Sequence, residues 1–133
     1  MTKLQTTPYV PTSWGELIDK ITILEIKVER LSRETARANA AKELALLREI
    51  ANPALAAGSD IPALVARLKS VNQALWEIED RIRDHERSGT FDDAFIGLAR
   101  SVYKRNDERG EVKRALNLAL GSELIEEKSY KPY

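Results

Sequence analysis

A row of apolar residues with the spacing of a heptad repeat runs through the middle of the chain. Its steps alternate between three and four residues, and its members are Ile61, Leu64, Leu68, Val71, Leu75, Ile78, Ile82 and His85. Residues spaced in this way lie on one face of an α-helix, so the row forms a seam along roughly 40 Å of helix. A helix with such a seam needs other helices to cover it. The sequence therefore predicts an all-α fold.

Turn-forming residues set the bounds of this helix, which is predicted over residues 60–88. Asp60 or Ser59 is the expected N-cap, and Pro62 suits the first turn because proline lacks the N–H that is unpaired there anyway. Gly89 suits the position just after the last turn, where a left-handed backbone conformation is common. The helix is thus expected to end directly before Gly89.

A further helix is predicted over residues 91–120, with Thr90 as its expected cap and Gly121 after its end. Residues 1–12 contain two prolines and no apolar period, which indicates an extended arm. Residues 121–133 show too little pattern for a helix or a strand, and they are expected to form an irregular tail.

The first helix is predicted to begin at Ser13, which with Glu16 has the spacing of a capping box. The apolar residues that follow form a wide stripe, so this helix is expected to be buried on more than one side. Neither glycine nor proline interrupts residues 16–52. One long helix over residues 13–51 is therefore favoured, and two helices with a bend near residues 32–36 are the alternative. Pro53 is expected to end the segment.

Short connections between long amphipathic helices favour antiparallel neighbours. Together the segments predict an antiparallel bundle of three to four long helices that forms a single domain over residues 1–133.

Composition excludes several classes of protein. The chain has 133 residues, no cysteine and one histidine, which excludes a disulfide framework and a site with several histidine ligands. Its 21 Lys and Arg residues balance its 21 Asp and Glu residues, so no basic excess points to nucleic acid. No apolar run is long enough to cross a bilayer, and no signal peptide is readable. A cytoplasmic location is expected, with no metal and no cofactor.

Three polar residues interrupt the apolar stripe of the last helix. Its register continues from Val102 to Asn106, Arg109 and Lys113 before apolar residues return. A buried charge is costly unless it is paired and hydrogen-bonded. One interpretation is a solvated face or a local rotation of the helix. The other is a polar layer that meets acidic partners or holds an anionic ligand.

The first helix offers carboxylates for such a layer. Asp19 and Glu25 lie on a side of the helix that is largely acidic, together with Thr22 and Glu29. They are either surface carboxylates with partners on their own helix or the acidic partners of Arg109 and Lys113. The candidate ligand-binding residues are therefore Asn106, Arg109, Lys113, Asp19 and Glu25.

The tail contains the run Glu126-Glu127-Lys128-Ser129-Tyr130. This run is either a solvated charged segment with an aromatic anchor, or a lid or peptide-like docking motif. Motifs for phosphate-binding loops, zinc proteases and serine hydrolases are absent from the sequence. Catalytic residues therefore remain unassigned.

Four runs of the sequence resemble a small bacterial family of unknown function. The first and last are the distinctive ones, from Gly15 to Lys27 (GELIDKITILEIK) and from Glu126 to Tyr130 (EEKSY). Between them lie residues 75–80 (LWEIED) and 103–107 (YKRND). The resemblance covers most of the chain and implies a bacterial cytosolic protein. It brings no activity and no site residues with it.

In outline the chain is also similar to the helical chorismate mutases, which bind a dicarboxylate with several cationic groups. Arg30, Arg48, Arg109 and Lys113 are the cations that this similarity offers. Gly15 stands where that family would have an arginine before the Ile-Asp pair. The similarity implies a cofactor-independent enzyme acting on an anionic substrate.

These observations rank three functions. The first is a binding or interaction module for a partner protein or a small anionic metabolite, in which Arg109→Ala would abolish binding without unfolding the protein. The second is the cofactor-independent enzyme. The third is a structural unit that forms oligomers, such as a homodimer, through the seam of residues 61–85.

Overall fold

The structure is a computed structural model of the chain, and it describes residue 4 and residues 6–133. Four helices form the fold: α1 (Trp14–Arg30), α2 (Glu34–Leu55), α3 (Ile61–Ser88) and α4 (Asp93–Ala119). The described residues contain no strand, so the predicted all-α class is confirmed.

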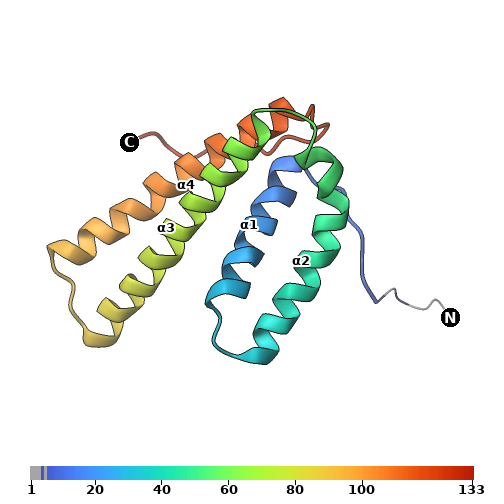
Figure 1. The fold of residues 1–133 in the computed structure, drawn as a ribbon. Helices are drawn as coiled ribbons and strands as arrows, with labels where there is room; N and C mark the ends of the chain where they lie inside the picture. Colours follow the sequence, from blue (N-terminus) through green and yellow to red (C-terminus); the bar gives the residue numbers. More distant parts are fainter. Residues whose placement is uncertain (1–3, 5) are drawn as a thin grey trace.

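The helices form two antiparallel hairpins, α1–α2 and α3–α4 (Figure 1). Helix α1 contacts all three other helices, whereas α2 packs mainly against α1. The beginning of α1 lies beside the last turns of α4, at the end of the molecule where the polypeptide also passes from α2 to α3 (Figure 1). Helix α1 is therefore the central element of the bundle.

Two apolar cores lie on different sides of α1. Toward α2 the core consists of Leu17, Ile21, Leu24, Ala40, Leu44 and Ala51. Toward α3 and α4 it consists of Ile18, Ile61, Leu68, Val112 and Leu116. The prediction that the first helix is buried on more than one side is thus confirmed.

The favoured single helix over residues 13–51 is wrong, because the chain turns back between α1 and α2. Leu31 and Arg33 both have extended backbone conformations, with ψ angles of 133° and 125°. The turn lets the apolar stripe of α2 pack on that of α1, whereas one continuous helix would expose both stripes to water. The predicted stop is also too early, because α2 continues through Pro53 to Leu55. Ala54 is buried in this last turn, so packing keeps it helical.

The other helix ends match the sequence more closely. Ser13 caps α1 and accepts a hydrogen bond of 3.1 Å from the Glu16 amide. Gly89 follows α3 with a φ angle of +66°, as its position predicts. Thr90 is not the cap of α4: Asp92 takes that role and accepts from the Phe95 amide at 3.0 Å. Asp60 precedes α3 without a capping hydrogen bond from its side chain.

The heptad seam of α3 faces the inside of the chain itself. Ile61, Leu68, Val71 and Ile78 are buried in it, and the rest of the seam is at least half-buried. The seam therefore contributes to the internal core of the chain itself.

Among the described residues, the first helix begins at Trp14 and the last ends at Ala119. Residues 1–3 and 5 of the predicted arm lie outside the described residues, and Tyr9 and Val10 are exposed. The tail leaves α4 at Gly121, which has a φ angle of +62°, and its residues from Glu123 onward are exposed. Over the described part of the chain, no helix combines the length and the apolar character that a membrane crossing requires.

The first turn of α1 rests directly on α4. The Gly15 amide donates a buried hydrogen bond of 2.6 Å to Oδ1 of Asn117, and the Trp14 amide donates to Oγ of Ser122 at 3.3 Å. A Cβ atom on Gly15 would lie 2.5 Å from the backbone oxygen of Lys113. Glycine is therefore required at position 15 for α1 to approach α4 this closely.

This close approach predicts that Gly15→Ala lowers the free energy of unfolding by about 1–3 kcal/mol, because the two helices must move apart. Urea unfolding measures the change. Gly97→Ala is the matched control, since a Cβ there meets no atom within 4 Å. Alanine in an open helix interior should raise stability by about 0.5–1 kcal/mol. Equal stability of Gly15→Ala and the wild type would contradict the account.

Candidate functional site

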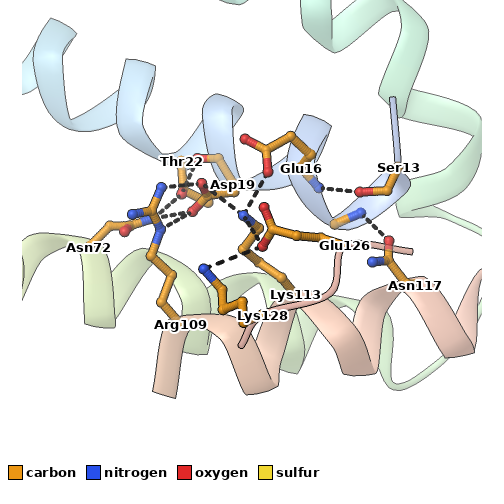
Figure 2. A network of polar contacts seen from close by, with 11 residues as sticks. Ser13, Glu16, Asp19, Thr22, Asn72, Arg109, Lys113, Asn117, Glu126 and Lys128 are labelled. Carbon is orange, nitrogen blue, oxygen red and sulfur yellow. Dashed lines mark hydrogen bonds and ion pairs between the residues drawn. The ribbon is translucent and has the colours of Figure 1, made fainter. Parts of the chain in front are cut away.

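A carboxylate on α1 is buried between three helices. The side chain of Asp19 is only 1% exposed and receives two hydrogen bonds from Arg109 of α4. These run from Nε to Oδ1 at 2.9 Å and from Nη2 to Oδ2 at 2.5 Å (Figure 2). Paired contacts of this kind match the planar guanidinium to the carboxylate. The hydrogen bonds to Asp19 hold the pKa of Arg109 above its ordinary value.

Helix α3 completes the surroundings of this carboxylate. Nδ2 of Asn72 lies 2.9 Å from both Oδ1 of Asp19 and Oγ1 of Thr22. The Thr22 hydroxyl donates in turn to the Asp19 carbonyl oxygen at 2.8 Å. Among the described residues, no buried side-chain polar atom lacks a hydrogen-bond partner. The Asp19 carboxylate is therefore compensated by Asn72 of α3 and Arg109 of α4.

Lys113 lies one turn after Arg109 on α4, and its side chain is 8% exposed. Its Nζ donates to Oε2 of Glu16 at 2.6 Å and to Oε1 of Glu126 at 3.4 Å (Figure 2). The nearer Asp19 oxygen is 3.9 Å away. Burial alone would lower the pKa of Lys113, but its hydrogen bond to Glu16 and the three carboxylate charges raise it. Lys113 is therefore a charged, buried ammonium.

The tail supplies the third carboxylate of this group. Glu126 contacts Lys113 and also lies 3.5 Å from Nζ of Lys128, and its side chain is 41% exposed. Partial burial acts to raise the pKa of Glu126, but the charges of Lys113 and Lys128 lower it below its ordinary value. Beside it, Glu127 pairs with Arg114 at 3.4 Å. The tail is thus held on α4 by ion pairs.

Two connected clefts lie where the tail crosses α4. A cleft of about 200 Å³ is lined by Glu16, Asn106, Arg109, Gly110, Lys113, Glu126 and Lys128. A larger, more open one of about 380 Å³ continues under the tail as far as Asp107 and Tyr130. Both are lined by Gly110, Lys113, Glu126 and Lys128. We call the two together the tail cleft.

The structure brings together four of the five candidate residues. Asp19, Arg109 and Lys113 are in direct contact, and Asn106 lines the tail cleft beside Arg109. Glu25 does not belong to this group. It faces α2 and α3 instead, where it pairs with Arg48 at 2.6 Å and with Lys69 at 3.7 Å.

Sequence reasoning missed several members of the site. Glu16 was assigned to the capping box, but its carboxylate reaches Lys113 rather than the Ser13 amide. Asn72 follows the seam residue Val71 and gave no separate signal. Glu126 and Lys128 belong to the tail run, which is interpreted from the sequence as a solvated segment or as a lid or docking motif. They are not among the five candidate ligand-binding residues.

The enzyme alternative requires cations that are free to bind an anionic substrate, but its four candidate cations are all paired with carboxylates. Within the described residues, Arg30 pairs with Glu77, Arg48 with Glu25, and Arg109 and Lys113 with the carboxylates above. Arg30 and Arg48 also lie outside the tail cleft. Residues 4 and 6–133 contain no group of three or more His, Asp or Glu side chains placed to hold a metal ion.

Fold and site together define an all-α protein whose central helix is joined to α3 and α4 through a buried ion-pair cluster. The chain belongs to a family of unknown function (DUF6165), which matches residues 9–133. The resemblance to a family of unknown function that the first and last runs indicated is thus confirmed. Comparison with curated proteins gives no match, and neither does comparison with solved structures.

The raised pKa of Lys113 predicts a loss of stability in alkaline solution. Because its pKa is higher in the folded protein, the charged form contributes stability that is complete below the unfolded value of about 10.4. This contribution disappears as the pH rises through the folded value. Lys113→Met should therefore be less stable than the wild type near pH 8, and this difference should shrink at about pH 11.

Urea unfolding of both proteins across this range measures the difference. Lys104→Met is the control, since Lys104 lies exposed on the same helix. Its difference from the wild type should stay small at each pH. A constant difference for Lys113→Met would show that its ammonium is not held by the three carboxylates.

Proposed function

We propose that the protein is a helical binding module whose tail cleft takes a carboxylate or phosphate group of its ligand. The observation that carries this proposal is the buried ammonium of Lys113, which bonds a carboxylate of the irregular tail. A ligand anion would bind in the place of Glu126. This agrees with the polar layer that the sequence suggested, but it assigns the two cations of that layer different roles.

Arg109 is not the ligand-binding cation in this proposal. Its Nε and Nη2 atoms are committed to Asp19, whose carboxylate has almost no contact with water. Taking Arg109 away from Asp19 would leave a buried charge unpaired, which typically costs about 3–5 kcal/mol. Arg109→Ala is therefore expected to disturb the fold, so it cannot serve as a selective test of binding.

Lys113 has a replaceable partner. An ammonium has three donors, and the short bond to Glu16 uses one of them. Glu16 is fixed within the first turn of α1, whereas Glu126 lies on the exposed tail at the longer distance of 3.4 Å. Moving Glu126 away costs little, because a partly exposed ion pair contributes only about 0–1 kcal/mol.

The lining of the cleft suits an anion once Glu126 has moved. In the smaller cleft, Lys113 and Lys128 then face one remaining carboxylate, Glu16, because Asp19 neutralises Arg109. The carboxylates of Asp107, Glu111 and Glu127 line only the larger cleft. Asn106 adds an amide that can donate a hydrogen bond. Charge-assisted bonds of this kind are roughly twice as strong as neutral ones. The proposed ligand is a small anionic metabolite or an acidic group of a partner protein.

Glu126→Gln tests the proposal, because it removes the competing charge and keeps the shape of the side chain. The variant should bind citrate and inorganic phosphate about two- to fivefold more tightly than the wild type, as expected for losing one partly exposed ion pair. Thermal shift gives the comparison, since a ligand at 100 times its dissociation constant adds about 2.7 kcal/mol. Potassium chloride at equal ionic strength corrects for general salt effects.

Glu127→Gln is the matched control. It makes the same chemical change one residue along, on a carboxylate that pairs with exposed Arg114. It should bind these anions as the wild type does, and adding Lys113→Met to Glu126→Gln should abolish binding. If both glutamine variants respond equally, or if Lys113→Met has no effect, the tail cleft is not an anion site.

A further inference from the structure

The tail follows α4 backwards from its end. Glu127 meets Arg114, Glu126 meets Lys113, and the side chain of Lys128 lies against Gly110. Farther along, the ring of Tyr133 packs edge-on against Tyr103 with centroids 4.9 Å apart. The tail thus runs antiparallel to α4 over about three helical turns, and it contacts residues that share one side of the helix.

The tail is longer than the surface it covers. Tyr133 lies seven positions after Glu126, and extended chain of that length spans up to about 23–25 Å. On α4, Lys113 lies ten positions after Tyr103, and the helix rises only about 15 Å over that distance. The tail thus has more length than it needs to follow the helix, and the cleft of about 380 Å³ lies where it crosses α4.

Little holds the tail in place. Its two ion pairs with α4 involve glutamates that are 41% and 78% exposed, and exposed pairs contribute little to stability. Leu124 and Ile125 are 45% and 37% exposed, so the start of the tail is partly covered. Beyond them, Tyr130 and Tyr133 are 75% and 76% exposed. This part of the tail buries little apolar surface, so another segment with the same contacts can replace it.

We infer that this side of α4 is a docking surface for an extended acidic segment of a partner protein, and that the tail occupies it as an internal competitor. The residues that hold the segment are Tyr103, Gly110, Lys113 and Arg114. Asp107 and Glu111 also line the cleft between Tyr103 and Arg114. Two consecutive carboxylates of the partner protein form ion pairs with Lys113 and Arg114. An aromatic residue seven positions after the first carboxylate packs on Tyr103. The inference rests on the proposed anion site and names its ligand.

Three features of the surface support a peptide ligand. Its two cations lie next to each other and match adjacent carboxylates, as the Glu126–Glu127 pair shows. Gly110 has no Cβ, and a Cβ there would lie 3.3 Å from Lys128, so its absence leaves room for a chain that crosses the helix. Ile96, seven positions before Tyr103 and so on the same side of α4, is 52% exposed. A partner segment gains apolar contact there.

The tail is covalently joined to α4, so it competes for this surface much more effectively than a free peptide does. A short flexible connection acts as an effective concentration in the millimolar range. The full-length wild type should therefore bind a free acidic peptide weakly. Substitutions that loosen the tail without touching α4 should strengthen peptide binding at least tenfold.

The test uses the full-length chain and a fluorescein-labelled peptide with the sequence of residues 123–133. The double variant Glu126→Gln with Tyr133→Ala loosens the tail, and fluorescence anisotropy should show at least tenfold tighter binding to it than to the wild type. Adding Tyr103→Ala to this variant should weaken binding at least fivefold. Adding Arg100→Ala, an exposed change on the same helix, should not.

Peptide variants test the register. Replacing both glutamates that correspond to Glu126 and Glu127 by glutamine, or the tyrosine that corresponds to Tyr133 by alanine, should abolish binding. Replacing the serine that corresponds to Ser129 should not. Equal binding of all these peptides, or of the variant with and without Tyr103→Ala, would overturn the inference.

Two further outcomes would overturn the inference of a partner peptide, and they can be distinguished from each other. Binding of citrate and phosphate to Glu126→Gln without any binding of the peptide would leave the anion site standing and exclude the peptide ligand. A dimeric mass of the wild type in light scattering, lost in the loosened variant, would assign the surface to the tail of a second copy. A monomeric wild type together with tight binding to the loosened variant is the expected result.

Discussion

The bundle depends on one buried ion pair, between Asp19 and Arg109. A carboxylate at 1% exposure would destabilise the fold by several kcal/mol without compensation. Arg109 of α4 and Asn72 of α3 both donate to it, so one side chain of α1 fixes the positions of two other helices. Because α1 and α4 are antiparallel, the next turn then places Glu16 opposite Lys113. The glycine contact at the start of α1 lies on the same side of the helix pair.

Within this polar layer, one cation stabilises the fold and the other is the proposed binding group. Arg109 is locked by a residue that cannot leave the core, whereas Lys113 shares its ammonium between fixed Glu16 and Glu126 of the exposed tail. The buried pair is a poor candidate for exchange with a ligand, and the second cation is a good one. Family membership extends over residues 9–133 and thus includes both the ion-pair cluster and the tail.

Much of the fold could be predicted from the sequence, because helix periodicity and turn residues are local signals. The direction of the chain after residue 30 could not, since only packing of the α2 stripe on α1 favours a hairpin over one helix. For the site, the interrupted apolar stripe of α4 indicated Arg109 and Lys113. Because buried charges are costly without partners, these two cations were expected to meet carboxylates. Which carboxylates of α1 those are depends on contacts across 90 or more residues, and no local pattern distinguishes Asp19 from Glu25. Breaking the buried pair costs more free energy than breaking the partly exposed one. This difference follows only from how deeply each side chain is buried, which the sequence does not reveal.

A double-mutant cycle on Asp19 and Arg109 tests the central claim most directly. The free energy of unfolding is measured for Asp19→Leu, Arg109→Met and the double variant. The account predicts a loss of about 3–5 kcal/mol for each single change and a far smaller loss for the double variant than the sum, because the apolar pair leaves no buried charge. The exposed pair Arg105 and Glu108 on the same helix gives the reference cycle, with a coupling below about 1 kcal/mol. Simple additivity for Asp19 and Arg109 would contradict the claim that this pair organises the bundle.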